Sequence, residues 1–193
     1  MNNPSTALFT EFIEFFPPLS LPLSLLPDIS QIPSDAVPLP AIMLEEFILP
    51  LEGSEADEYT EYIPYGYLSD LKPFNALIYW KAGLLQYEFV MATYNNEGSV
   101  ISHAIIGGMR LDDGGMIHSV AVILEDGTIT IAEGFVASDE SSIGDQTNTY
   151  EMKIDSSGII KYDTDEYEQE RKQHQSHDEP GNAEDSEAEC GAE

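Results

Sequence analysis

Basic residues are scarce in this sequence. Seven lysines and arginines stand against 36 aspartates and glutamates among 193 residues, so the formal net charge is -29. A surface this negative repels the phosphates of nucleic acids and the anionic headgroups of lipids. The sequence therefore disfavours nucleic acid and membrane as partners. Solubility or a high-salt environment accounts for the charge, and a basic protein is the partner class that the charge favours.

Cysteine and long apolar runs are scarce as well. The single cysteine, Cys190, rules out an intrachain disulfide. The first 18 residues contain no lysine or arginine and include Glu11 and Glu14, a pattern unlike a secretory signal. No uncharged apolar run approaches the roughly 18 residues that a membrane-spanning helix needs. We expect a cytoplasmic protein.

Short catalytic motifs are missing too. The sequence has no GxSxG elbow, no HExxH and no glycine-rich phosphate loop. The pairs Ser102-His103 and His118-Ser119 lie in predicted strands, where adjacent side chains point to opposite faces. Neither serine can then donate to its neighbouring histidine. The sequence predicts no catalytic residue and no cofactor.

Strand-forming composition dominates residues 74–162. Segments rich in β-branched and aromatic residues alternate with turns that contain glycine, asparagine or aspartate. The seven predicted strands are 74–81, 84–94, 99–109, 116–124, 128–135, 149–154 and 159–162. We predict a mainly β fold, an antiparallel meander that closes partly into a barrel or sandwich.

Proline is concentrated before this predicted meander. Nine of the twelve prolines lie within residues 1–50, which predicts a Pro-rich arm packed on the core. Capping signals favour short helices over residues 5–16 and 41–49. Between the helices, four alternating leucines have the period of an edge strand with one apolar face: Leu19, Leu21, Leu23 and Leu25.

Two acidic zones complete the predicted organisation. Residues 51–73 form an acidic, tyrosine-rich connector. Residues 163–193 contain twelve acidic residues against Arg171 and Lys172, with no large apolar residue after Tyr167. Because such a segment cannot recover its ordering entropy by burial, we predict a disordered tail.

The connector supplies one candidate site. Tyrosine anchors rimmed by carboxylates suit a basic partner. The candidate residues are Glu58, Tyr59, Glu61, Tyr62, Tyr65 and Tyr67. The alternative is a loop whose tyrosines pack on the sheet.

A cavity between the sheet and the N-terminal arm is the second candidate site. Its predicted lining is Trp80, Tyr87, His118 and Glu133. A two-residue turn at 126–127 would place His118 diagonally opposite Glu133, where the two side chains pair. His103 would join them as a metal ligand, but it lies opposite Leu124, six residues from His118, or about 20 Å along the strand. One metal ion cannot bridge that distance, so we predict no metal site.

Four stretches of the chain carry a resemblance to known sequences. They are EFFPPLSLPLSL, VPLPAIMLEEFILPLEG, ALIYWKAGLLQYEFVMATYNNEGSVIS and SVAVILEDGTITIAEG. In the order of these elements, roughly residues 9–135 resemble a group of uncharacterised proteins from Bacteroidota. The resemblance implies a shared fold and carries over no activity.

The sequence favours a non-enzymatic binding or interaction module, including an acidic inhibitor of a basic protein. The alternative is a small-ligand carrier or enzyme that uses the cavity between sheet and arm. The oligomeric state is left open.

Overall fold

The computed structural model describes six ranges of the chain. The described residues are 4–28, 37–53, 59–84, 86–112, 115–137 and 147–163. They all belong to the first of two units, Met1–Asp163 and Thr164–Glu193. The predicted disordered tail therefore lies outside the described residues, except for Asp163.

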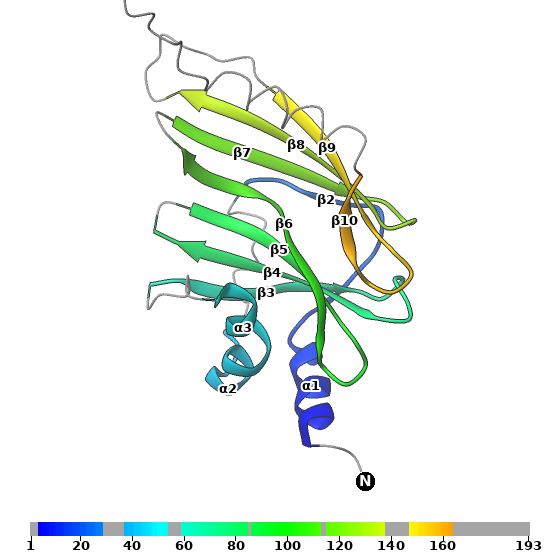
Figure 1. The fold of residues 1–193 in the computed structure, drawn as a ribbon. Helices are drawn as coiled ribbons and strands as arrows, with labels where there is room; N and C mark the ends of the chain where they lie inside the picture. Colours follow the sequence, from blue (N-terminus) through cyan, green and yellow to red (C-terminus); the bar gives the residue numbers. More distant parts are fainter. Residues whose placement is uncertain are drawn as a thin grey trace, which may run out of the picture. The chain divides into compact units, whose positions relative to one another are not determined.

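Helices and strands occur in the following order (Figure 1). The N-terminal elements are α1 (Pro4–Glu14), β1 (Pro18–Leu19), β2 (Leu23–Leu25), α2 (Ala41–Met43), the π-helical turn η2 (Leu44–Ile48) and α3 (Leu49–Glu52). The strands that follow are β3 (Glu61–Leu68), β4 (Asn75–Gly83), β5 (Gln86–Tyr94), β6 (Val100–Asp112), β7 (Gly115–Ile123), β8 (Thr128–Ala137), β9 (Thr147–Ile154) and β10 (Ile160–Tyr162). None of the helices in the described ranges combines the length and apolarity needed to cross a membrane.

The mainly β prediction is confirmed. All seven predicted strands are present as β4 to β10, with ends that differ by a few residues. Strand β3 was not predicted, because it lies in the stretch assigned to a connector. Its pairing with β4 shifts register between Pro64 and Gly66, and this bulge interrupts the alternation that identifies a strand.

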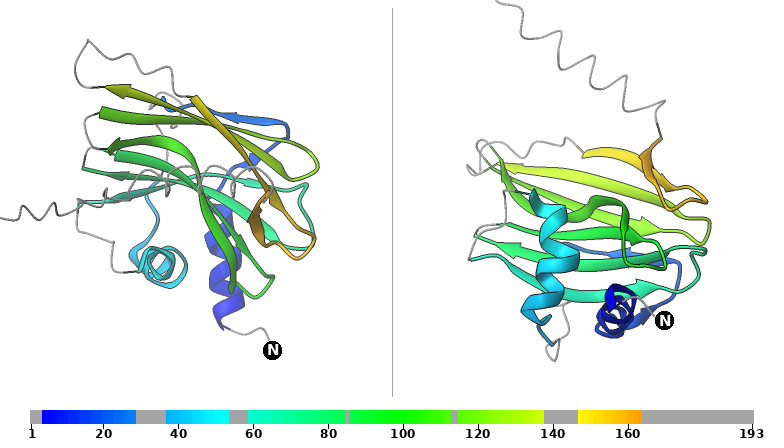
Figure 2. Two further views of the ribbon diagram at one scale, coloured as in Figure 1. Left: turned by 45° about the horizontal axis from the view of Figure 1, so that its top comes forward. Right: turned by 60° about the horizontal axis from the view of Figure 1, so that its bottom comes forward.

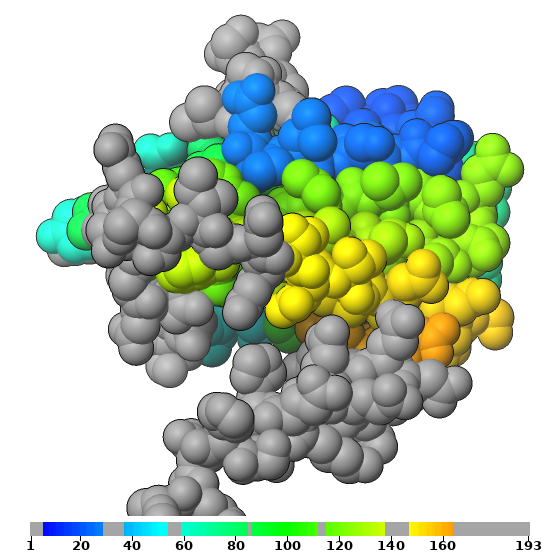
Figure 3. Space-filling view, turned by 90° about the horizontal axis from the view of Figure 1, so that it is seen from above, coloured from blue at the N-terminus to red at the C-terminus, as the bar shows by residue number. Residues whose placement is uncertain are grey.

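The strands form one sheet in the order β1-β3-β4-β5-β6-β7-β8-β9-β10. Neighbours from β3 to β10 are antiparallel, whereas β1 pairs in parallel with β3. Strand β2 pairs with β7 at Ala121–Ile123, beyond the point where β6 leaves β7. Figure 3 shows the blue N-terminal arm alongside these green strands. The arm therefore joins two distant parts of the sheet.

Strand β6 bends at Gly108. The φ of Gly108 is 136°, and a side-chain carbon there would collide with the backbone of Tyr87 and Glu88. The β6 residues that precede Gly108 pair with β5 and not with β7, so His103 lies opposite Ala92. The predicted pairing of His103 with Leu124 is therefore wrong, and His118 lies opposite Met109.

The inner face of the sheet encloses an apolar core. Leucines 19, 21, 23 and 25 of the arm all pack on this core, as their alternation predicts. The β9–β10 hairpin closes over it, since the Thr93 hydroxyl lies 2.6 Å from the Gly158 carbonyl oxygen and the Ile160 N–H donates to the Ser102 hydroxyl at 3.2 Å. This closure gives the partial barrel that the sequence predicts.

The outer face of β3, β4 and β5 is covered by the helices (Figure 2). Aromatic rings fill the space between helices and sheet: Phe12 stacks on Phe47 with centroids 4.7 Å apart, and Phe9 lies 5.4 Å from Tyr94. The two predicted helices are confirmed; α1 buries Phe9 and Phe12, and Phe16 is buried just after the helix ends. We call this layer the outer core.

Candidate functional site

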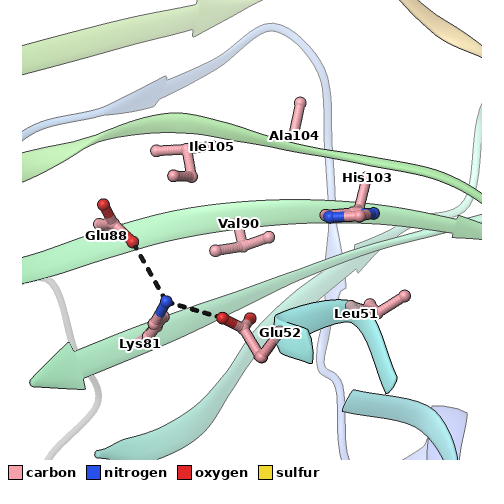
Figure 4. A pocket seen from close by; sticks show the side chains of 8 residues that line it. All are labelled: Leu51, Glu52, Lys81, Glu88, Val90, His103, Ala104 and Ile105. Atoms are coloured by element: carbon pink, nitrogen blue, oxygen red, sulfur yellow. Dashed lines mark ion pairs between the residues drawn. The ribbon is translucent and has the colours of Figure 1, made fainter. Parts of the chain in front are cut away.

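A pocket of about 200 Å³ opens where the outer core ends. It lies between the C-terminal end of α3 and the outer faces of β4, β5 and β6 (Figure 4). Its lining combines charged and apolar side chains: Leu51, Glu52, Lys81, Glu88, Val90, His103, Ala104 and Ile105. The helices cover β4 and β5 here but leave His103 and Ile105 of β6 exposed, so the pocket is open on the β6 side.

Two buried tyrosines fix the helical wall of the pocket. The Tyr94 hydroxyl donates to the Phe47 carbonyl oxygen in the π-helical turn at 2.7 Å. The Tyr79 hydroxyl donates to Oε1 of Glu52 at 2.7 Å. Burial and the Glu52 carboxylate both raise the pKa of Tyr79, so this hydroxyl keeps its proton. Glu52 is therefore held in one position at the end of α3.

Lys81 lies between two carboxylates at the base of the pocket. Its Nζ is 2.7 Å from Oε2 of Glu52 and 3.7 Å from Oε2 of Glu88. The two strands place Lys81 directly opposite Glu88, on the face that also carries Tyr79 and Val90. Burial opposes the charge of Lys81, but the hydrogen bond and charge of Glu52, helped by Glu88, raise its pKa above the ordinary value.

Glu88 is less well compensated than Glu52. The residue is 8% exposed, and Lys81 is the partner that the described part of the chain gives it, at a distance too long for a hydrogen bond. Burial raises the pKa of Glu88 above its ordinary value, and the charge of Glu52 adds to this. The cations Lys81 and Arg110 lower the pKa and offset the rise in part. A carboxylate in this position gains from any additional donor.

The chemistry of the pocket suits binding of a cation. Two carboxylates face one internal ammonium, and Leu51, Val90 and Ile105 supply apolar walls. Lys81 stays protonated because its pKa is raised, so its amine is not available as a nucleophile. An incoming cationic group with an apolar stem fits both kinds of lining.

The predicted tyrosine-rich surface is divided among different environments. Tyr62 is buried in the outer core, and Tyr67 packs against the same core. Tyr65 packs on the inner core, with its ring 5.1 Å from that of Phe89. The tyrosines of β3 thus do not share one exposed face. Tyr65 and Tyr67 are two residues apart and would share a face in a regular strand, but the bulge between Pro64 and Gly66 puts them on opposite faces.

Two residues of that prediction are exposed: Tyr59, at 69%, and Glu61. Glu58 lies outside the described residues. The alternative in which the tyrosines pack on the sheet therefore holds for Tyr62, Tyr65 and Tyr67.

The four residues predicted to line a second cavity do not converge. Trp80 and Tyr87 lie in contact at the inner core, with ring centroids 5.6 Å apart, and the Tyr87 hydroxyl donates to the Pro27 carbonyl oxygen at 2.6 Å. His118 is opposite Gly134, whereas its neighbour Ser119 is opposite Glu133. His118 and Glu133 thus point to opposite faces, and their predicted pairing is wrong.

The β7–β8 turn explains this error. Leu124 and Thr128 close a three-residue loop through a 2.8 Å hydrogen bond, and Gly127 has a φ of 82°. The prediction assumed a two-residue turn, and a shift of one residue moves every side chain to the other face. Glu133 pairs instead with Arg110 at 3.2 Å and with the Tyr150 hydroxyl at 3.3 Å.

The histidines occupy separate environments. His103 lies at the exposed rim of the pocket. The adjacent Ser102 hydroxyl accepts the Ile160 N–H on the other face of β6. Ser102 and His103 therefore point to opposite faces of the strand, as predicted. Within the described ranges, no three His, Cys, Asp or Glu side chains are arranged to hold a metal ion.

Sequence reasoning missed all three charged residues of the pocket: Glu52, Lys81 and Glu88. One signal was available for Lys81, because it is one of seven basic residues in the chain and ends the apolar segment FNALIYWK. A lysine in such a strand requires a buried counter-charge. Nothing in the sequence identified Glu52 among 36 acidic residues.

Comparison with known proteins gives no match: no family model, curated protein or solved structure is significantly similar to the chain. The resemblance to the Bacteroidota group therefore stays a prediction.

Proposed function

We propose that this protein is a non-enzymatic binding module for a basic protein, and that the pocket beside α3 receives a cationic side chain of that partner. The observation that carries the proposal is the imbalance of charge in the pocket. Glu52 and Glu88 are both largely buried, and Lys81 is the ammonium that faces them. A second cation from a partner would restore the balance.

The charge of the whole chain supports the same partner class. A net charge of -29 accelerates encounter with a basic protein and repels acidic ones. Three of the basic residues that could oppose this field, Lys81, Arg110 and Lys161, are already in ion pairs. An acidic inhibitor that covers a basic surface in the cytoplasm is the specific form of this proposal.

A binding assay with defined peptides tests the proposal. The full-length chain is titrated into a labelled peptide of alternating arginine, lysine and glycine, and into an acidic peptide of equal length, at low and at physiological salt. We expect the basic peptide alone to bind, with an affinity that falls as salt increases.

Two variants locate the binding site. Glu88→Gln should weaken the basic peptide by about tenfold or more, because it removes the poorly compensated carboxylate. Glu97→Gln makes the same change of charge at an exposed residue of the β5–β6 turn and should leave binding nearly unchanged. Absence of binding at low salt, or equal losses in the two variants, would contradict the proposal.

A further inference from the structure

The two carboxylates of the pocket, Glu52 and Glu88, differ in their hydrogen bonds and ion pairs. Oxygen atoms of Glu52 receive the Tyr79 hydroxyl and the Lys81 ammonium, each at 2.7 Å. Among the described residues, the ion pair of Glu88 is with the same ammonium at 3.7 Å, although the residue is as buried as a core side chain. Glu88 is therefore the carboxylate of the pocket with the longer ion pair, and its oxygens can accept two parallel hydrogen bonds.

A guanidinium group is a better hydrogen-bond donor to the Glu88 carboxylate than an ammonium is. Its planar fork donates two parallel N–H bonds to a carboxylate, whereas an ammonium acts as a point charge. Lys81 already provides an ammonium between Glu52 and Glu88, and Glu88 is still left without a hydrogen bond from it. The methylene stem of an arginine would lie on Ile105, at the side where the pocket is open.

Building on the proposed function, we infer that the pocket selects an arginine side chain of the partner over a lysine side chain, by bidentate hydrogen bonding to Glu88. Lys81 keeps Glu52 neutralised. The remaining negative charge is then that of Glu88, and the single positive charge of an arginine balances it.

Three blocked tripeptides test this selectivity. They have the form acetyl-Gly-X-Gly-amide, in which X is arginine, lysine or citrulline, the uncharged analogue of arginine with the same planar shape. Binding to the full-length chain is measured by calorimetry and by NMR shifts at low salt. We expect the arginine peptide to bind about tenfold or more tightly than the lysine peptide, and the citrulline peptide to bind more weakly than either.

The variant Glu88→Gln sharpens the test. It should abolish the preference, so that the arginine and lysine peptides bind equally weakly, while Glu97→Gln keeps the full preference. Circular dichroism and the melting temperature establish that each variant is folded. A Glu88→Gln variant that is folded and still prefers arginine would overturn the assignment to Glu88.

The possible failures are distinguishable. Equal binding of the arginine and lysine peptides to the wild-type chain overturns the guanidinium inference and leaves the proposed function in place. Equal binding of arginine and citrulline overturns the role of charge in the pocket. If neither cationic peptide binds at low salt, both the inference and the proposed function are wrong.

Discussion

The two faces of β4 and β5 bury their residues in different ways. The inner face carries Ile78, Trp80, Phe89 and Met91 and packs them in an apolar core. The outer face carries aromatic residues such as Tyr79 under the helices and ends with Lys81 and Glu88 at a pocket. The same two strands thus serve stability on one side and carry charged groups on the other.

This difference shows where binding chemistry can be placed in a small β fold. Charged groups in the inner core would have no acceptors or donors except one another. At the end of the outer core, α3 supplies Glu52 while β6 leaves the pocket open, so the charges are desolvated and still reachable. The following substitutions test this difference between the two faces.

The largest effect is expected from removing an aromatic ring of the outer core. Phe12 is fully buried and contacts Phe16, Phe47 and Tyr94. Phe12→Ala should lower the free energy of unfolding by about 3–5 kcal/mol, measured by urea denaturation. The half-buried Phe15 provides the control, and an equal loss in Phe15→Ala would show that the outer core does not depend on this ring packing.

Removing the ammonium from the pocket should have the next largest effect. Lys81→Met leaves two buried carboxylates without their cation and should cost about 3 kcal/mol of stability. Lys153 is exposed on β9, and Lys153→Met should change stability little. If the double variant Lys81→Met/Glu88→Gln is no more stable than Lys81→Met, Glu88 does not contribute to the repulsion.

Acidification should weaken binding of the arginine peptide. Because burial raises the pKa of Glu88, the carboxylate takes up its proton at a higher pH than an ordinary glutamate. Below that raised pKa, we expect the affinity to fall by up to about tenfold per pH unit in a calorimetric titration. An affinity that stays constant until the ordinary range of glutamate would contradict the role of Glu88.

A smaller effect is expected at the closure of the inner core. Thr93 is fully buried, and its hydroxyl lies 2.6 Å from the Gly158 carbonyl oxygen. Thr93→Val leaves that carbonyl without its donor and should cost about 1–2 kcal/mol, measured by thermal denaturation. Peptide binding should not change, because Thr93 faces away from the pocket.

Much of the fold followed from the sequence because the alternation of residues and the turn signals are local. The seven strands of 74–162 and the leucines of the arm are of this kind. Strand β3 was missed because Pro64 and Gly66 interrupt its pattern, and the β7–β8 register was wrong because Gly127 extends the turn by one residue. Both failures involve irregular backbone that periodicity does not encode.

The candidate site could not be predicted in the same way. The pocket unites α3, β4, β5 and β6, and its position depends on the bend of β6 and on the helix layer. Glu52 and Lys81 are 29 residues apart in the numbering and meet only in the folded chain. The large number of acidic residues also prevented the identification of Glu52, since one glutamate among many carries little information.

We propose that Glu88 serves binding and not stability, and the variant Glu88→Gln tests this role. A raised pKa means that the folded state favours the protonated carboxyl, so ionised Glu88 lowers stability above that pKa. At neutral pH we expect Glu88→Gln to have a free energy of unfolding equal to or above that of the wild type, and to lose the arginine peptide. A variant that loses stability and retains the peptide would contradict the account.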